Sequence, residues 1–236
     1  MVSCIKAYNN ITTMQISTPT SIDDLLSKAY QIAGLTIGQA AQMAHQEIPE
    51  RLLHNKGWIG QLIEQLLGAE AGSEAKPDFP LLGVELKTIP LNSAGQPLES
   101  TYVSTVPFHN ITGLSWQNSV VWQKLQRVLW IPIIGDRTLP FTQRIIGTPL
   151  LWEPSSHHAS ILQNDWEEHI EKIALGLLDQ LKSSDGIYLQ VRPKAADSHA
   201  LCTTFDAEGA IVQTLPRGFY LRTGFTREII EQFYSY

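Results

Sequence analysis

Two carboxylates and a lysine lie close together in residues 77–87, which read PDFPLLGVELK. Asp78 falls in a predicted turn, and Glu85 lies on a strand predicted over residues 81–89. Lys87 follows two residues later, and because side chains alternate along a strand it shares a face with Glu85. Mg²⁺ prefers oxygen ligands and usually takes one or two carboxylates together with water and substrate phosphate. Asp78 and Glu85 could therefore hold one divalent cation, with Lys87 directed at the same volume.

Such a site favours hydrolysis of a phosphodiester. A bound metal ion acidifies a water ligand and relieves the charge that develops on the phosphoryl oxygens. Lys87 could orient or deprotonate the attacking water and offset phosphate charge. The spacing D-x6-E-x-K also arises by chance, and the alternative interpretation is a surface strand that carries an ion pair between Glu85 and Lys87.

The strand is preceded by a helix predicted over residues 58–67, because its apolar residues recur at intervals of three and four. The opposite face is rich in glycine, with Gly57 and Gly68 on it and Gly60 at its edge. A glycine inside a helix costs about 1 kcal/mol relative to alanine, so this face indicates that something large packs closely against it. Glu64 lies on the same face, either as a third carboxylate of the site or as a solvated surface group.

The remaining pattern predicts an α/β fold, with a mixed central sheet flanked by helices. Helices are predicted over residues 25–33, where residues 21–24 form a capping box, and over residues 36–44, 158–182 and 226–234. Strands are predicted over residues 101–106, 128–134, 187–191 and 210–222. The first of these is expected to form a hairpin with residues 81–89, and Pro132 predicts a bulge or an edge position. Residues 197–209 are expected to form a loop.

Composition limits the class of protein. The 236 residues suit one domain, and 43% hydrophobic with 17% charged residues exclude intrinsic disorder. With 17 basic and 23 acidic residues, the net charge of −6 argues against a general nucleic-acid coat. Residues 119–144 nevertheless carry four bases and one acid, and residues 187–227 carry five bases and three acids. A local basic cleft therefore remains compatible with the sequence.

Several other classes of site find no support. Cys4 and Cys202 are too few for a disulfide framework or a tetrahedral zinc site, and no H-x-x-x-H pattern occurs. The first residues do not form a signal peptide, and no apolar run approaches the ~18 residues of a membrane-spanning helix. These features predict a cytoplasmic protein without a membrane partner.

The segments around the carboxylates resemble the MutH family, the strand-discriminating endonucleases of methyl-directed mismatch repair. The likeness begins with GWIG at residues 57–60 followed by Glu64, and with GVELKTIP at residues 83–90. It continues in segments at residues 124–132, 147–152, 192–196 and 214–221, and it is weakest in the first 20 residues and at residues 205–212. The resemblance implies a restriction-endonuclease-like fold in two lobes around a DNA-binding cleft. A single nuclease domain, residues 1–236, would contain a catalytic lobe at roughly 20–150 and a DNA-reading lobe at roughly 151–236.

The resemblance also implies roles for individual residues. Asp78, Glu85 and Lys87 match the catalytic triad, Glu64 matches a helical carboxylate near the metal site, and Lys124 matches an active-site lysine. The metal ligands would be Asp78, Glu85 and Glu64, holding one or two Mg²⁺ ions. The DNA-binding residues would be Arg192, Pro193, Lys194, Tyr220, Arg217, Lys56 and Tyr102.

Chemistry supports several of these DNA-binding roles. Arginine can contact guanine O6 and N7 with two hydrogen bonds, which makes Arg192 the best candidate for base reading. Tyr220 could pack against an adenine edge, where an N6-methyl group would change the contact. Lys56, Lys194 and Arg217 suit phosphate contacts, although Lys56 and Arg217 have solvated surface cations as their alternative.

The implied function is Mg²⁺-dependent nicking of the unmethylated strand at hemimethylated GATC sites in double-stranded DNA. MutL would activate the enzyme after MutS has found a mismatch, and one site per chain suits a monomer that makes single-strand nicks. One alternative is a restriction endonuclease that cuts both strands at GATC, which would need a second active site. The other is a DNA-binding protein that senses methylation without cleaving, which would not need clustered acids beside phosphates.

Overall fold

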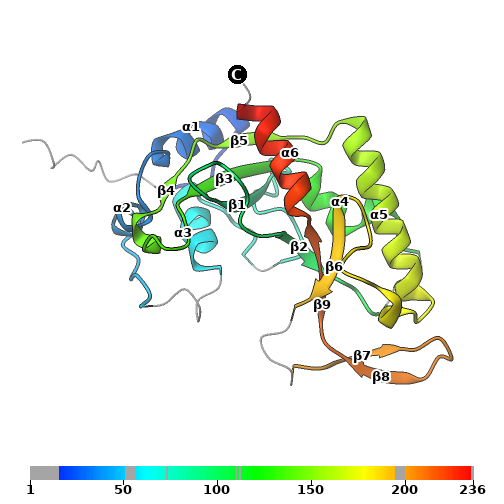
Figure 1. Ribbon diagram of the computed structural model, residues 1–236. Coiled ribbons are helices and arrows are strands. Elements are labelled where there is room, and N and C mark those ends of the chain that lie inside the picture. Colours follow the sequence, from blue (N-terminus) through cyan, green and yellow to red (C-terminus); the bar gives the residue numbers. More distant parts are fainter. Residues whose placement is uncertain are drawn as a thin grey trace, which may run out of the picture.

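The structure is a computed structural model that describes residues 16–50, 57–72, 74–109, 111, 113–194 and 200–234 (Figure 1). Its central strand is β3 (Val128–Ile134). This strand pairs in parallel with β1 (Glu85–Leu91) and in antiparallel fashion with β4 (Ile145–Ile146) and β5 (Leu150–Trp152). The predicted mixed central sheet flanked by helices is therefore confirmed.

Both faces of β3 are buried, which explains its uninterrupted apolar sequence. Val128 and Trp130 point into one hydrophobic core, whereas Leu129 and Ile131 point into another. The prediction that Pro132 marks an edge strand is wrong, because β3 has partners on both sides. On one side of β3, β5 pairs with its first half and β4 with its last two residues. Pro132 lies between these two paired segments, where no residue of β4 or β5 is in register with it, so the proline is tolerated there.

Three helices cover one face of the sheet: α1 (Ile22–Ile32), α2 (Ile37–Met43) and α3 (Trp58–Leu67). Each begins and ends close to the residues that the sequence predicts. The Ser21 side chain caps α1 by accepting a hydrogen bond from the backbone N–H of Asp24 at 3.1 Å. Thr36 and Gln39 form a capping box at α2.

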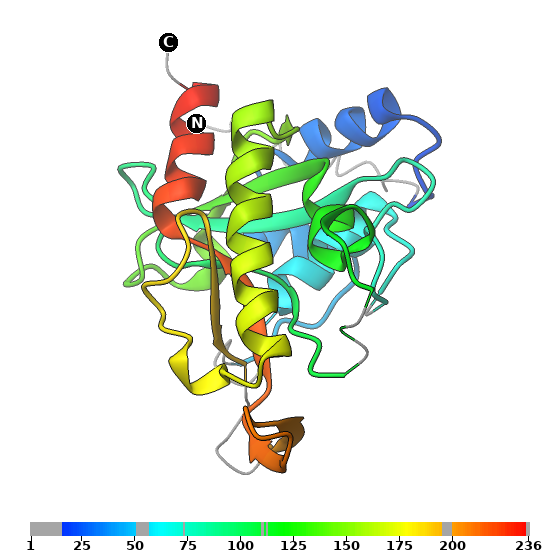
Figure 2. The same ribbon diagram turned by 90° about the vertical axis from the view of Figure 1, so that its right-hand side faces the viewer.

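The opposite face is covered by α4 (Val120–Leu125), α5 (Ser156–Ala174) and α6 (Thr223–Tyr234). Figure 2 shows α5 and α6 side by side, and His158 Nε2 lies 3.1 Å from Glu228 Oε1 between them. The prediction that α5 continues to residue 182 is wrong. Gly176, at φ +69°, ends it, because the N–H of Gly176 bonds to Ile173 O and that of Leu177 bonds to Lys172 O. Short 3₁₀ helices η2 (Trp116–Asn118), η3 (Phe141–Gln143) and η4 (Leu178–Gln180) complete the helical elements that the structure describes.

A second sheet lies over the same face, in the order β2 (Thr101–Thr105), β9 (Arg217–Leu221), β6 (Leu189–Pro193). The predicted hairpin between residues 81–89 and 101–106 is therefore wrong. The turn after β1 does form, with the N–H of Leu98 bonded to Pro90 O, but the chain then leaves β1. β2 pairs with β9, because Val103 buries its side chain in the core beneath the second sheet.

A two-stranded hairpin projects from the second sheet (Figures 1 and 2), formed by β7 (Cys202–Phe205) and β8 (Ile211–Thr214). The sequence predicted a loop for the first of these and one continuous strand over residues 210–222. Asp206 closes the turn, since its Oδ1 accepts the N–H of Ala210 at 2.7 Å. Within the described residues, no helix has the length and apolar character needed to cross a membrane.

Candidate active site

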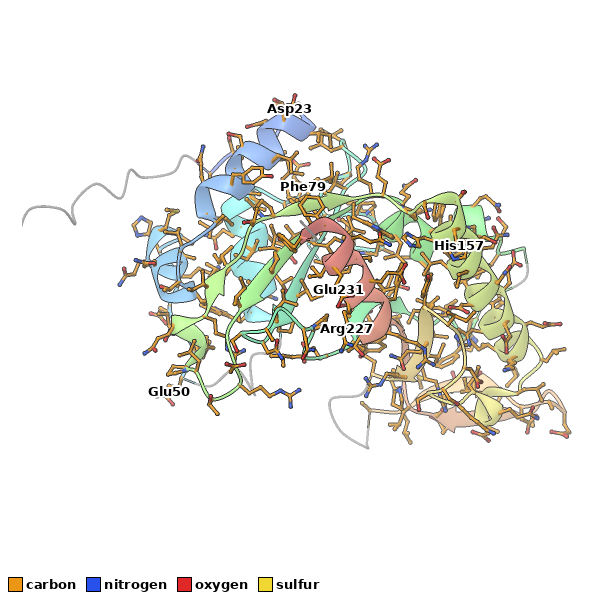
Figure 3. The ribbon with its side chains drawn as sticks, turned by 45° about the horizontal axis from the view of Figure 1, so that its top comes forward. Asp23, Glu50, Phe79, His157, Arg227 and Glu231 are labelled. Atoms are coloured by element: carbon orange, nitrogen blue, oxygen red, sulfur yellow. The ribbon has the colours of Figure 1, made fainter. Side chains whose placement is uncertain are left out.

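A closed turn brings Asp78 next to the start of β1. Phe79 and Val84 exchange two backbone hydrogen bonds, at 2.9 and 3.2 Å, at the two ends of the six-residue segment that separates Asp78 from Glu85 in the sequence. Phe79 is only 2% exposed and lies inside the fold beneath α1 (Figure 3). Asp78 Oδ2 accepts the N–H of Leu86 at 2.8 Å, which fixes the carboxylate beside the strand.

Glu85 is the centre of the charged cluster. Its side chain is 1% exposed, and both of its carboxylate oxygens lie 3.0 Å from Nζ of Lys124, which α4 supplies from 39 residues further along the chain. Lys87 Nζ also donates to Glu85 Oε1. The two lysines are largely buried, with 12% and 13% of their side chains exposed. A nearly buried carboxylate is thus paired with two lysine side chains.

The third carboxylate comes from α3. This helix lies over β1, and a Cβ added to Gly60 would be in ordinary contact with both elements, 4.0 Å from Thr88 Oγ1 and 3.9 Å from Glu64 Oε1. Burial raises the pKa of Glu64, and the negative charge of Asp78 raises it further, while Lys87 acts in the opposite direction. Burial likewise raises the pKa of Asp78, followed by the charge of Glu85, against the hydrogen bond from Leu86. Three carboxylates therefore interact in a poorly solvated volume that contains two lysines.

The donor set suits a hard divalent cation. Asp78 and Glu85 supply two carboxylates, the number that Mg²⁺ usually takes from a protein, and a cation between them would relieve their mutual repulsion. Among the described residues, no group of three or more His, Cys, Asp or Glu side chains is arranged to hold a metal ion. An ion at Asp78 and Glu85 would therefore complete its coordination with water and substrate oxygens.

A cavity of about 690 Å³ opens beside this cluster and connects the two sheets. Glu64 and Lys87 line it from the carboxylate cluster, and Arg192 and Tyr220 line it from the second sheet. Its remaining lining residues are Gly57, Gly60, Leu86, Thr88, Pro90, Glu99, Ser100, Thr101, Tyr102 and Pro193. Gly57 and Gly60 of α3 therefore border open space large enough for a ligand, whereas Gly68 caps the other end of the helix against the backbone of Ser17.

Aromatic and basic side chains are stacked on the wall opposite the carboxylates. Tyr102 and Tyr220 are registered across β2 and β9, with ring centroids 5.4 Å apart at 66°. The Lys194 ammonium lies 3.6 Å from the Tyr102 centroid, and the Arg192 guanidinium lies 5.8 Å from that of Tyr220. Ser100 Oγ accepts from Arg192 Nη1 at 2.8 Å, so the guanidinium is held in place.

Gly218 is a functional position that the sequence analysis missed. A Cβ there would lie 2.9 Å from the ring of Tyr102 and 3.0 Å from that of Tyr220, so only glycine leaves room for the tyrosine pair. The sequence does contain a signal for this role. Gly218 precedes Tyr220 by two residues, so the two residues share one face of the strand and the glycine lies beside the tyrosine ring.

The structure thus brings most of the predicted residues to one cavity or its border. Glu64, Asp78, Glu85, Lys87 and Lys124 form the charged cluster, and Tyr102, Arg192, Pro193 and Tyr220 line the opposite wall, with Lys194 stacked on Tyr102. Arg217 is half-buried at the start of β9 and does not line this cavity. Lys56 lies outside the described residues.

Comparison with known proteins gives a consistent result. A family model described as "DNA mismatch repair enzyme MutH" matches residues 67–165, which include Asp78, Glu85, Lys87 and Lys124. The chain is 50% identical over 221 residues to a "DNA mismatch repair protein MutH" of Shewanella baltica (strain OS185), covering 94% of this chain and 99% of that one. The protein of the same name from Shewanella oneidensis is 49% identical over 217 residues, covering 92% of this chain and 97% of the relative. At this identity over nearly its whole length, the chain belongs to the MutH family of DNA mismatch repair enzymes.

Proposed function

We propose that this enzyme is a Mg²⁺-dependent endonuclease that nicks the unmethylated strand of DNA at hemimethylated GATC sites during methyl-directed mismatch repair. The general activity, a nuclease of DNA mismatch repair, follows from the family. The observation that carries the finer proposal is the single cavity that has Glu64 and Lys87 on one wall and Arg192 and Tyr220 on the other. A duplex seated there would meet hydrolytic and base-reading groups together.

On the hydrolytic side, Asp78, Glu85 and, at its edge, Glu64 would hold one or two Mg²⁺ ions. When bound, Mg²⁺ supplies an acidified water and relieves charge on the phosphoryl oxygens. Lys87 is oriented by Glu85 and faces the cavity, which suits it to position the attacking water against the scissile phosphate. Lys124 holds the Glu85 carboxylate in a fixed orientation through both oxygens.

On the reading side, Arg192 would contact guanine with two hydrogen bonds in the major groove. Tyr220 lies within stacking distance of this guanidinium, so a base beside the guanine would meet the tyrosine ring. An N6-methyl group on adenine would crowd that contact, which gives methyl discrimination a physical basis. Lys194, Arg217 and Lys56 would contact the backbone around these bases, and the Tyr102 ring would contact the bases being read.

The proposal extends to organisation and partners. The enzyme would act as a cytoplasmic monomer with one nuclease domain, in which residues 20–150 form the catalytic lobe and residues 151–236 the reading lobe. The two hydrophobic cores on opposite faces of β3 support two lobes, with β2 reaching across to pair in the second sheet. MutL would activate nicking, and MutS would act indirectly through MutL.

The test uses a supercoiled plasmid with one hemimethylated GATC site, incubated with Mg²⁺ with and without MutL. We expect nicks only in the unmethylated strand, stimulated by MutL and absent in Asp78→Ala. That variant should still bind DNA, because it removes a carboxylate from the neighbourhood of the phosphates. Asp179→Ala, which removes an exposed carboxylate in η4, is the matched control and should nick normally.

Each other outcome rejects a stated part of the proposal. Cleavage of both strands would indicate a restriction endonuclease, and binding without cleavage even with MutL would indicate a methylation-sensing protein. Normal nicking by Asp78→Ala would show that the carboxylate cluster is not the active site.

A further inference from the structure

A second cavity, of about 430 Å³, adjoins the first at the N-terminal end of α3. The two share five lining residues, namely Gly57, Gly60, Thr88, Pro90 and Glu99. Two arginines, Arg137 and Arg144, line only the second cavity of the pair. Both come from the segment between β3 and β4, which neither the family resemblance nor the proposed mechanism uses. The second cavity is therefore a basic extension of the proposed DNA-binding cavity.

Arg144 Nε finds no hydrogen-bond acceptor among the residues that the structure describes. Its Nε is buried without a hydrogen-bond partner, and the described residues offer its guanidinium no ion pair. Its aliphatic stem is fixed, because it packs so closely on Gly135 that a Cβ there would lie 2.7 Å from Arg144 Cγ. A buried donor left unpaired is destabilising, and such a group indicates a partner other than the residues that the structure describes.

The surroundings of Arg144 favour an anion. Arg137 is exposed, and its Nη2 donates to Leu98 O at 3.0 Å, which holds the side chain over the cavity wall. The N-cap residue of α3 is Gly57, so no side chain caps the positive end of the helix dipole. Glu99 is the one acid among the residues that line the cavity, and it is solvent-exposed, where its charge is screened.

The position of this cavity identifies the part of the DNA that it would meet. α3 and β1 run in opposite directions, since Glu64 interacts with Asp78 and Glu85 whereas Gly57 lines the cavity with Pro90. From Glu85 to Pro90, five strand residues at about 3.3 Å each cover roughly 16 Å. For a duplex whose axis follows β1, at about 3.4 Å of helix axis per phosphate of one strand, this length would correspond to on the order of five base pairs.

We infer that Arg144 and Arg137, with the N-terminal end of α3, form a second phosphate site that holds the DNA backbone on the order of five base pairs from the cut. The inference rests on the proposed function, because it needs DNA in the first cavity. The contact lies outside a four-base recognition sequence, so it adds affinity and register without reading bases. The phosphate would meet the part of the Arg144 guanidinium that lines the cavity.

Salt dependence of binding provides the first test. Binding of a long duplex with one hemimethylated GATC is measured by fluorescence anisotropy, with Ca²⁺ in place of Mg²⁺ to prevent cleavage. Each phosphate contact contributes about 0.9 to the slope of log affinity against log salt. Between 50 and 200 mM salt, the wild type should therefore lose about 3.5-fold more affinity than Arg144→Gln. Arg227→Gln, which removes an exposed arginine on α6 (Figure 3), should retain the wild-type slope.

A neutral phosphate provides the second test and locates the contact. Duplexes are made with one methylphosphonate at successive positions on either side of the cut. A methylphosphonate at one position, about five base pairs from the cut, should weaken binding by the wild type. The same duplex should bind Arg144→Gln as well as unmodified DNA does, because this variant has already lost the contact with that phosphate. Arg137→Gln, at an exposed position that cannot disturb the core, should show the same coupling more weakly.

The outcomes separate this inference from the proposed function. If the wild type binds and nicks GATC DNA but Arg144→Gln keeps its salt slope and shows no coupling at any position, the phosphate site is refuted and the function stands. If Arg144→Gln loses only its stimulation by MutL, these arginines contact protein and the inference is wrong. Failure of the wild type to bind GATC DNA would overturn both.

Discussion

Replacing Asp78 by asparagine should stabilise the folded protein while it abolishes nicking. Burial and the charge of Glu85 raise the pKa of Asp78, so ionisation of this carboxyl at neutral pH works against folding. Asparagine keeps an oxygen that can accept the N–H of Leu86 but carries no charge. Relieving a strained functional group of this kind commonly gains about 0.5–2 kcal/mol.

The assay is urea unfolding in buffer with EDTA. At an m-value of about 1–3 kcal/mol per molar urea, a gain of about 1 kcal/mol moves the midpoint upward by roughly 0.3–1 M. Adding Mg²⁺ should then stabilise the wild type more than Asp78→Asn, because the ion offsets a repulsion that the variant no longer has.

The pH dependence fixes the sign of this effect. Folding raises the pKa of Asp78 above its unfolded value of about 3.8, so the folded state binds more protons between the two values. The unfolding free energy of the wild type should therefore fall as pH rises through this window. The advantage of Asp78→Asn should be complete above the folded-state pKa and should disappear below the unfolded one.

Asp165 provides a matched control with the opposite expectation. It is also buried, but it accepts three backbone N–H groups, from Ile187, Tyr188 and Leu189, at 2.7–2.8 Å. Asp165→Asn leaves part of this donor set unpaired and should lower stability by about 1–3 kcal/mol. If Asp78→Asn instead destabilises the protein as Asp165→Asn does, the argument from repulsion among the carboxylates is refuted.

Three further predictions concern other residues of the cavity. Lys124→Met should lower the free energy of unfolding by about 2 kcal/mol in urea titrations, because Glu85 loses one of its two lysine partners. This is less than the ~3–5 kcal/mol expected when a buried charge loses every partner. Unchanged stability would mean that the pair between Lys124 and Glu85 does not stabilise the fold. Gly218→Val should weaken duplex binding roughly tenfold in anisotropy titrations, because its side chain displaces the Tyr102 ring that would contribute about 1–3 kcal/mol of base contact. Arg192→Lys should cost about 1–3 kcal/mol for GATC DNA with little change for unrelated DNA, whereas an equal loss on both would assign Arg192 to phosphate.

The local elements of this fold could be predicted because adjacent residues decide them. The apolar stripe of α3 and the shared face of Glu85 and Lys87 follow from backbone periodicity, and the Ser21 cap of α1 follows from its residue type. The predictions that were wrong concern segments whose structure depends on contacts with residues far away in the sequence. Residues 101–105 resemble the second strand of a hairpin, yet β9 takes them, because burial of Val103 decides which partner pairs with them. Residues 177–181 continue the apolar residues of α5 at helical spacing, yet the helix ends at Ala174, because Gly176 adopts a positive φ.

The chemistry divides in the same way. By itself the sequence determined that Asp78, Glu85 and Lys87 share one turn and strand, because their separation leaves the backbone few alternatives. Only the tertiary structure decided that Lys124 bonds both oxygens of Glu85 and that Gly218 leaves room for Tyr102 beside Tyr220. It also decided that Arg144 Nε has no acceptor among the described residues. These contacts depend on which strands pair and on how the helices pack across the sheets. The free energy that favours this arrangement comes from the burial of side chains that lie far apart in the chain.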